Sequence, residues 1–160
     1  MAIRSLRYEG DEILRKKSRK IEVIDDRIKE LAEDMFDTMH KFDGLGLAGV
    51  QVGILKRIIV IDLYDDVSKF CLINPEIIEK SEETAEVEEG CLSYPNQFGK
   101  VVRSVKVKVK ALELDGKKVT LEAEGLLAQA LQHEIDHLNG EVFKDKILPG
   151  TFEIITPQDK

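Results

Sequence analysis

The amino-acid sequence predicts an α+β domain in which mostly antiparallel strands pack around a helix near the C-terminus, with a second helix near the N-terminus. Three observations support this fold class. Two segments, one early and one late, repeat apolar residues at helical spacing. Residues 105–110 alternate strictly between valine and lysine, as a half-buried strand does. Asp115-Gly116 separates two strand-like segments and is a strong hairpin signal.

The length of 160 residues, with 42% hydrophobic and 34% charged residues, is typical of one globular domain, which we place at residues 1–160. The net charge of −7 argues against direct binding to nucleic acid or to anionic membranes. No apolar run approaches the roughly 20 residues that span a bilayer. Residues 1–5 lack the apolar core of a secretory signal. The two cysteines are too few for a disulfide framework and suit a reducing cytosol.

The first half of the chain predicts a helix, a loop and two strands. Residues 25–42 have the pattern of an amphipathic helix that Asp25 or Asp26 caps. A glycine-rich loop follows over residues 44–53. The apolar segments 57–61 and 70–74 predict buried strands, the second of which Pro75 should end. The apolar positions of the helix are Ile28, Leu31, Met35, Phe36 and Met39, and we interpret His40, after them, as a solvated residue.

The second half predicts a hairpin followed by a helix. The hairpin joins residues 111–114 to residues 117–123, and the lysines at 106, 108 and 110 are interpreted as the solvent-facing side of a strand. Contact of these lysines with ribosomal RNA is the less favoured alternative. Gly125 then opens the late helix, and Gly140 should stop it.

This late helix carries the most informative feature of the chain, the pentad His133-Glu134-Ile135-Asp136-His137. It holds two of the three histidines. Residues four apart in a helix are separated by about 40° around the axis and about 6 Å along it, so both imidazoles project from one face and can share a metal ion. Glu134 lies beside them and can take a proton from a water that the metal activates. We therefore expect a metal-binding helix. Asp136 points away from the metal and is expected to pair with Arg103.

A catalytic metal site of this kind usually needs a third protein ligand. Phe143 stands where long-form zinc peptidases carry a third histidine, and it cannot bind metal. Glu141 and Glu153 are available, although nothing around them supports the role. Cys91 is better placed, because glycine and proline flank it and imply a turning backbone. A thiolate there would complete a Cys/His/His site with one position open for water.

A third element is the glycine-rich segment 44–51. Its small residues allow the backbone to approach a ligand closely. Gln51 ends the segment, and its amide can donate to a developing oxyanion without carrying charge.

Together, segments 44–51, 89–93 and 132–137 resemble the three signature motifs of the peptide deformylase family, in the same order and at the expected spacing. The resemblance runs from about Leu6 to Leu148. It implies a single catalytic domain that removes the N-formyl group from the initiator N-formylmethionine of nascent polypeptides and releases formate. It also implies roles for three sets of residues. Cys91, His133 and His137 hold the metal, Glu134 moves the proton, and Gln51 with the backbone N–H of Leu92 stabilises the oxyanion.

The resemblance implies one divalent metal ion as the cofactor, Fe(II) in first place, with Zn(II) or Ni(II) able to replace it. It implies N-formylmethionyl nascent chains as partners, transient contact with the ribosome at most, and a bacterial-type cytoplasm. The methionine side chain needs an apolar pocket beside the metal. The residues implied for that pocket are Gly46, Leu45, Val87, Leu126 and Ala130.

The chain departs from the family pattern at three places. Gly49 stands where the motif usually has alanine, which is expected to loosen the support of Gln51. Phe98 stands where some relatives carry arginine beside the peptide-binding cleft. The tail after Leu148 does not have the pattern of a basic C-terminal helix, which argues against ribosome docking through it.

Two alternatives remain at the level of sequence. Another metal-dependent amidase or peptidase could use the same pentad on internal peptide bonds. An inactive relative could bind nascent chains or store metal, although it would need neither Glu134 nor Gln51. A purely structural zinc module would want a fourth protein ligand, and none is evident near Cys91 or the late helix.

Overall fold

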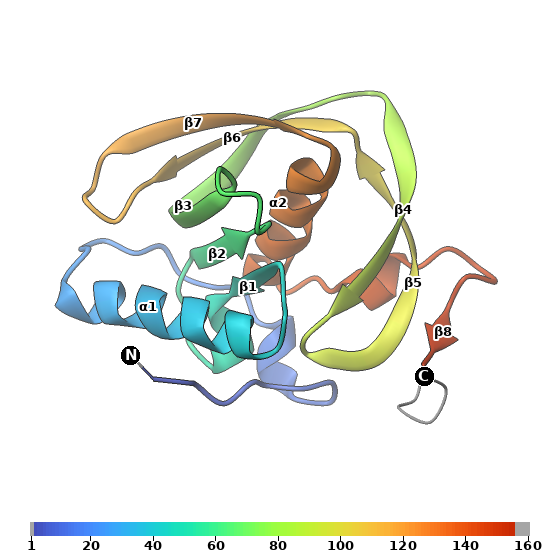
Figure 1. Cartoon of the computed structure of the whole chain (residues 1–160), viewed down its shortest axis with the longest axis horizontal. Coiled ribbons are helices and arrows are strands. Elements are labelled where there is room, and N and C mark those ends of the chain that lie inside the picture. The colour runs from blue at the N-terminus through green and yellow to red at the C-terminus, as the bar shows by residue number, and fades with distance from the viewer. Residues whose placement is uncertain (1, 156–160) are drawn as a thin grey trace.

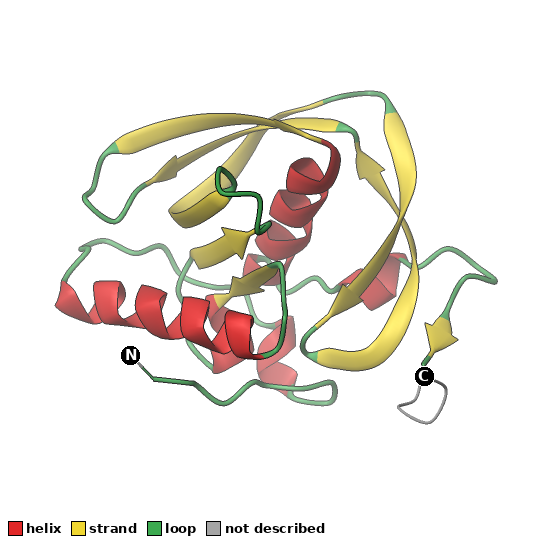
Figure 2. Ribbon diagram, in the orientation of Figure 1, coloured by secondary structure: helices red, strands yellow, loops and turns green. Residues whose placement is uncertain are grey.

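Residues 2–155 are described by the computed structural model of the chain, which confirms the predicted α+β class. Two antiparallel sheets enclose a central helix, α2 (Gly125–Leu138), and a second helix, α1 (Asp26–Lys41), lies across the outside of the larger sheet (Figures 1 and 2). Among residues 2–155, no helix is both long enough and apolar enough to cross a membrane.

The larger sheet has five strands in the order β1-β2-β3-β6-β7. Neighbouring strands in it are antiparallel, and the β6–β7 pair is the hairpin that Asp115-Gly116 predicted. The strands are β1 (Gly46–Ala48), β2 (Ile58–Asp62), β3 (Lys69–Lys80), β6 (Lys106–Leu112) and β7 (Lys118–Glu124).

The smaller sheet is a long hairpin with a short third strand, in the order β4-β5-β8. Its strands are β4 (Thr84–Cys91), β5 (Tyr94–Ser104) and β8 (Glu153–Ile154). The hairpin turns at Leu92-Ser93, directly after Cys91. β8 belongs to the tail after Leu148, and Thr156 and Pro157 of that tail lie outside the described residues. Short 3-10 helices complete the chain: η1 (Glu12–Arg15), η2 (Gly49–Val52) and η3 (Phe143–Lys146).

Strand β2 explains how both helices attach to one sheet. Its residues 58–61 are all buried. Alternate side chains of a strand face opposite sides of the sheet, and here both sides are covered. Ile58 and Val60 pack with the apolar stripe of α1, whereas Ile59 and Ile61 pack with α2. A strand covered on both faces needs a continuous apolar run, which is what the sequence has there.

Both predicted helices are confirmed close to their expected bounds. The side chain of Asp25 caps α1 by accepting a hydrogen bond from the backbone N–H of Ile28 at 3.1 Å. Helix α2 begins at Gly125 and ends before Gly140, whose φ of 77° is the left-handed conformation that favours glycine.

Two expectations about the first half were wrong in detail. The segment 44–53 is not only a loop, because it contains β1 and η2. Strand β3 does not end at Pro75 and continues to Lys80, because the register shifts between Ile73 and Glu76 and places the proline, which lacks an N–H, in a bulge.

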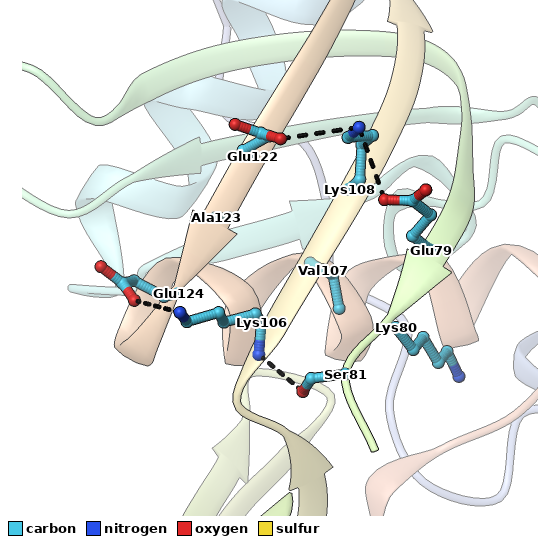
Figure 3. Close-up of a pocket in the computed structure, with 9 residues that line it drawn as sticks. All are labelled: Glu79, Lys80, Ser81, Lys106, Val107, Lys108, Glu122, Ala123 and Glu124. Carbon is cyan, nitrogen blue, oxygen red and sulfur yellow. Dashed lines mark hydrogen bonds and ion pairs between the residues drawn. The ribbon is translucent and has the colours of Figure 1, made fainter. Parts of the chain in front are cut away.

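The lysine row lies on the side of β6 opposite its buried valines, and Figure 3 shows two of its members, Lys106 and Lys108, among carboxylates of the neighbouring strands. Lys106 Nζ is 3.8 Å from a Glu124 oxygen. Lys108 Nζ lies 3.4 Å from Glu79 and 3.5 Å from Glu122. Two of the three lysines thus lie beside carboxylates, which favours the interpretation as a solvent-facing strand surface over an RNA contact.

Candidate metal centre and active site

Helix α2 presents its two histidines side by side on the face turned toward the β4–β5 hairpin. The ring centroids of His133 and His137 are 5.0 Å apart, and both side chains are buried. Leu126, Ala130 and Glu134 follow one another at four-residue spacing and line a cavity beside the same face. One helix therefore supplies the histidines, the glutamate and part of the cavity wall.

Cys91 reaches the histidines from the end of β4. Its Sγ lies 3.3 Å from Nε2 of His137, and one donor atom from each of Cys91, His133 and His137 lies within 4.8 Å of the others. Around one tetrahedral ion with metal–donor distances of about 2.0–2.3 Å, donor atoms lie about 3.4–3.6 Å apart. The three side chains thus fit a single ion after small adjustments. Within residues 2–155, these are the histidine, cysteine or acidic side chains that lie close enough together, three at a time, to hold a metal ion.

The two alternative glutamates do not reach this cluster. Glu141 pairs with Lys146 at 3.6 Å, and Glu153 lies exposed on β8. The described residues therefore offer three side chains that could hold a metal, and such a set would leave coordination positions for water and substrate.

Sequence reasoning missed the role of Glu89, which holds one of the histidines in place. An oxygen of Glu89 lies 2.8 Å from Nδ1 of His133, so the ring offers its Nε2 to the metal. The available signal was the strand period, because residues two apart in a strand lie on the same face. Glu89 precedes Cys91 by two residues in β4, but a register shift between Gly90 and Cys91 interrupts that period, so the pattern alone does not assign Glu89 to the site.

Arg103 on β5 anchors Glu89 in turn. Its Nε and Nη2 donate to the two Glu89 oxygens at 2.7 and 2.8 Å, and its Nη1 donates to Asp136 at 2.7 Å. The predicted pairing of Asp136 with Arg103 is confirmed. Burial alone would raise the pKa of Glu89, but the hydrogen bonds from Arg103 and His133 hold that pKa at about 2. Glu89 is therefore charged at any physiological pH.

The electrostatics of the two histidines favour a positive ion between them. Burial lowers the pKa of His137 well below its ordinary value, which keeps the ring neutral, the form that binds metals. Burial would lower the pKa of His133 as well, but the charge of Glu134 and the hydrogen bonds that the ring makes to Cys91 and Glu89 raise it well above the ordinary value. Acidic groups thus stabilise positive charge beside His133, whether a proton or a metal ion carries it.

Glu134 lies beside the cluster, and its raised pKa is typical of a residue that takes up and releases a proton near neutral pH. Burial raises its pKa to about 7, and its Oε2 is 4.0 Å from Nε2 of His133. Its Oε1 is buried without a hydrogen-bond partner among the described residues. A Cβ at Gly46 would lie 2.6 Å from Oε2 of Glu134, so glycine at this position leaves the carboxylate its space.

Gln51 is fixed at both ends of its amide. Oε1 accepts a hydrogen bond from the backbone N–H of Ala48 at 2.9 Å. Nε2 donates to Oγ of Ser93 at 3.1 Å and lies 3.4 Å from Sγ of Cys91. The amide N–H₂ therefore faces the metal cluster, and Ser93, which sequence reasoning did not single out, helps to orient it.

The glycine at position 49 fits its surroundings closely rather than loosening them. A Cβ there would lie 3.0 Å from the carbonyl oxygens of Ile54 and Lys56 and from the side chain of Ile58. The expectation of a loosened support for Gln51 does not agree with this packing, because the backbone around Gly49 is already in close contact.

A cavity of about 780 Å³ opens beside the cluster. Its apolar walls include Leu45, Leu92, Phe98, Leu126 and Ala130, and its polar lining includes Gln51, Cys91, His133 and Glu134. Gly46 also lines it. Val87 does not belong to this lining and pairs with Val101 further along the β4–β5 hairpin. The cavity thus combines an apolar pocket with polar groups that converge at one end.

Comparisons with known proteins agree with this geometry. The family model of polypeptide deformylase matches residues 3–152. Peptide deformylase 1 of Clostridium perfringens is 55% identical over 145 residues, which cover 91% of this chain and 98% of the relative. The peptide deformylase of Acetivibrio thermocellus is 53% identical over 148 residues, which cover 92% of this chain and 85% of the relative. The crystal structure of peptide deformylase from Thermotoga maritima matches with a TM-score of 0.89 at 42% identity, covering 93% of this chain and 100% of that chain.

Proposed function

The chain belongs to the polypeptide deformylase family, and from that premise we propose how its residues release formate. Members of this family are metal-dependent hydrolases that remove the N-formyl group from nascent chains, and this chain is such an enzyme. The observation that carries the residue assignment is the cluster of Cys91, His133 and His137 beside the buried Glu134.

We propose that Cys91, His133 and His137 hold one divalent ion. The donor distances, the neutral His137 and the Glu89 contact that orients His133 all support this assignment. The ion we propose is Fe(II), with Zn(II) and Ni(II) as replacements, because a Cys/His/His set suits several metals of this class. When bound, such an ion lowers the pKa of a coordinated water toward about 7 and polarises the formyl oxygen.

Glu134 is the proposed proton carrier. Burial raises the pKa of its carboxyl, to about 7 before any ion binds, which makes the carboxylate more basic than an exposed glutamate. It can therefore accept a proton from the attacking water and deliver that proton to the departing amine.

Gln51 and Leu92 are the proposed donors to the oxyanion. The Gln51 amide is held by Ala48 and Ser93 with its N–H₂ toward the cluster. Leu92 follows Cys91 at the hairpin turn, and the residue lines the cavity. Donors that are fixed before the reaction stabilise the tetrahedral intermediate without reorganising, which is why one such donor is worth about 100- to 1000-fold in rate.

The methionine side chain is proposed to occupy the apolar part of the cavity. Leu45 and Gly46 form one side of it, and Leu126 and Ala130 form the other from α2. Leu45 and Leu126 are 39% and 50% exposed, so the pocket stays open to an incoming chain end. We leave Val87 out of the pocket, because it lies outside the cavity lining.

The proposed substrates are N-formylmethionyl nascent chains in a bacterial-type cytoplasm. We expect contact with the ribosome to be transient, because residues 149–155 form a turn and the short strand β8 in place of a basic helix.

The test is formate release from a formyl-Met-Ala peptide by anaerobically purified protein, with metal content measured on the same sample. The expected result is rapid release with about one ion per chain. The same peptide without the formyl group is the control, and cleavage of its internal bonds would indicate a peptidase instead. Bound metal without formate release, even after reloading with Fe(II) or Ni(II), would indicate a binding protein and refute the proposal.

A further inference from the structure

Tyr64, in the turn between β2 and β3, has an unusual backbone conformation for its residue type. Its φ is 59°, the left-handed region in which a bulky side chain is strained. Turn chemistry favours glycine or asparagine at such a position. Strain of this kind persists where other contacts fix the residue, and it clusters near functional sites. The contacts of the Tyr64 side chain are therefore informative.

Asp62, the last residue of β2, stabilises the turn through hydrogen bonds. One oxygen of Asp62 accepts a hydrogen bond from the Tyr64 backbone N–H at 2.8 Å, and the other lies 2.8 Å from Nε2 of His40 on α1. The rings of His40 and Tyr64 are 5.7 Å apart. His40 is thus not a freely solvated residue, as its position had predicted, but part of a cluster that sets the direction of the Tyr64 ring.

The Tyr64 hydroxyl reaches back to the edge of the active-site cavity. It donates to the buried carbonyl oxygen of Gly44 at 2.8 Å. Burial, Asp62 and Asp43 raise the pKa of Tyr64, so the hydroxyl keeps its proton. The Gly44 N–H in turn donates to Met39, which ties the residue to the end of α1. Hydrogen bonds to both its N–H and its carbonyl oxygen therefore hold the backbone of Gly44.

The other side of this segment rests directly on groups that act on the formyl group. A Cβ at Gly44 would lie 2.7 Å from Cδ1 of Leu92, and a Cβ at Gly46 would lie 2.6 Å from Oε2 of Glu134. There is no free space between the backbone of residues 44–46 and these two residues. A displacement of the segment would therefore move the side chains of Leu92 and Glu134, the second of which is the proposed proton carrier.

We propose that Tyr64 is a positioning residue of the reaction, whose hydroxyl holds residues 44–46 against Leu92 and Glu134. The inference rests on the proposed function, because it concerns the placement of the proposed oxyanion donor and proton carrier. The strained backbone of Tyr64 fits this role, since glycine would relieve the strain but would lose the hydroxyl.

The test compares Tyr64→Phe, Tyr64→Gly and the control Asp66→Gly in the metal-loaded full chain. Asp66 is an exposed residue of the same turn with a φ of 68°, so its glycine variant relieves similar strain without touching Gly44. Tyr64→Phe removes only the hydroxyl. Each variant is assayed for kcat and KM on the formyl-Met-Ala peptide, for thermal stability, and for backbone hydrogen exchange in residues 44–47.

Both Tyr64 variants should lower kcat by about 3- to 10-fold, the range for loss of one neutral hydrogen bond. KM should rise by no more than kcat falls, because residues 44–46 contribute Leu45 and Gly46 to one side of the proposed methionine pocket, while Leu126 and Ala130 belong to α2. Exchange in residues 44–47 should accelerate, while α2 stays protected. Tyr64→Gly should lose activity without losing stability, and Asp66→Gly should retain full activity.

Wild-type kcat and unchanged exchange in Tyr64→Phe would overturn the inference. An equal loss in Asp66→Gly would also overturn it, because the effect would then come from the turn as a whole. A wild-type protein that releases no formate would instead refute the proposed function. In that case the exchange measurement still decides whether Tyr64 restrains the segment.

Discussion

Replacing Glu89 with glutamine should destabilise the protein strongly at neutral pH and very little in acid. The variant keeps the size of the side chain and removes its charge. The Arg103 guanidinium, only 5% exposed, would then retain Asp136 as its remaining charged partner at 2.7 Å. The Nδ1 of His133 would lose its carboxylate acceptor.

The magnitude follows from the pKa of Glu89, which lies at about 2 compared with an ordinary value of 4.5. At about 1.4 kcal/mol per pH unit, the charged form contributes up to about 3 kcal/mol to the free energy of unfolding. Because the pKa is lowered in the folded state, this contribution is fully present above about pH 4.5 and is lost as the pH falls toward 2.

The assay is urea denaturation of both proteins in the presence of a chelator, at several pH values from 7 down to 3. The difference in unfolding free energy should be about 3 kcal/mol at pH 7 and should shrink steadily below pH 4.5. Glu88→Gln is the matched control, because Glu88 is the exposed neighbour on the other face of β4 and its variant should stay within about 0.5 kcal/mol. Equal stability of Glu89→Gln and wild type at pH 7, or a difference that stays constant down to pH 3, would refute the reasoning.

The remaining predictions concern metal retention and turnover. Cys91→Ser should lose metal on dialysis, because a hydroxyl is a poorer ligand than a thiolate, and unchanged metal content by elemental analysis would remove Cys91 from the ligand set. Glu134→Gln should retain the metal but lose about 100- to 10,000-fold in kcat, and substantial residual formate release would exclude Glu134 as the proton carrier. Gln51→Ala should lower kcat by about 100- to 1000-fold, and it should cost about 1–3 kcal/mol of stability by leaving the Ala48 N–H without its partner; an unchanged kcat would discard the oxyanion role. Gly46→Ala should lower kcat, because its Cβ would lie 2.6, 2.9 and 3.0 Å from Oε2, Cγ and Cδ of Glu134 and would displace that side chain; wild-type kcat would show that the segment tolerates the extra carbon.

Features that depend on local sequence were predictable. The two histidines share a face because they are four residues apart in a helix, and the helix itself follows from its apolar period. The Asp115-Gly116 hairpin was likewise encoded in adjacent residues. The grouping of Cys91 with the histidines needed the resemblance to a family as well, because 42 residues separate Cys91 from the first of them.

Features that depend on contacts distant in sequence were not predictable. The role of Glu89 is fixed by Arg103 on β5 and His133 on α2, and no local pattern joins these three residues. His40 looked like a solvated helix end because its partner, Asp62, lies 22 residues further along the chain. The short β1 has no signal of its own, since its pairing with β2 and not its composition makes it a strand.

Titration of metal-free protein with Fe(II) under anaerobic conditions tests whether Cys91 helps to hold the single ion that formate release requires. Formate release is followed after each addition, in parallel for wild type and Cys91→Ser. Activity should rise linearly and stop rising at one ion per chain in the wild type, and the Cys91→Ser variant should show no such break. Full activity without added metal, or a break at one ion per chain that is the same in the variant, would contradict this expectation.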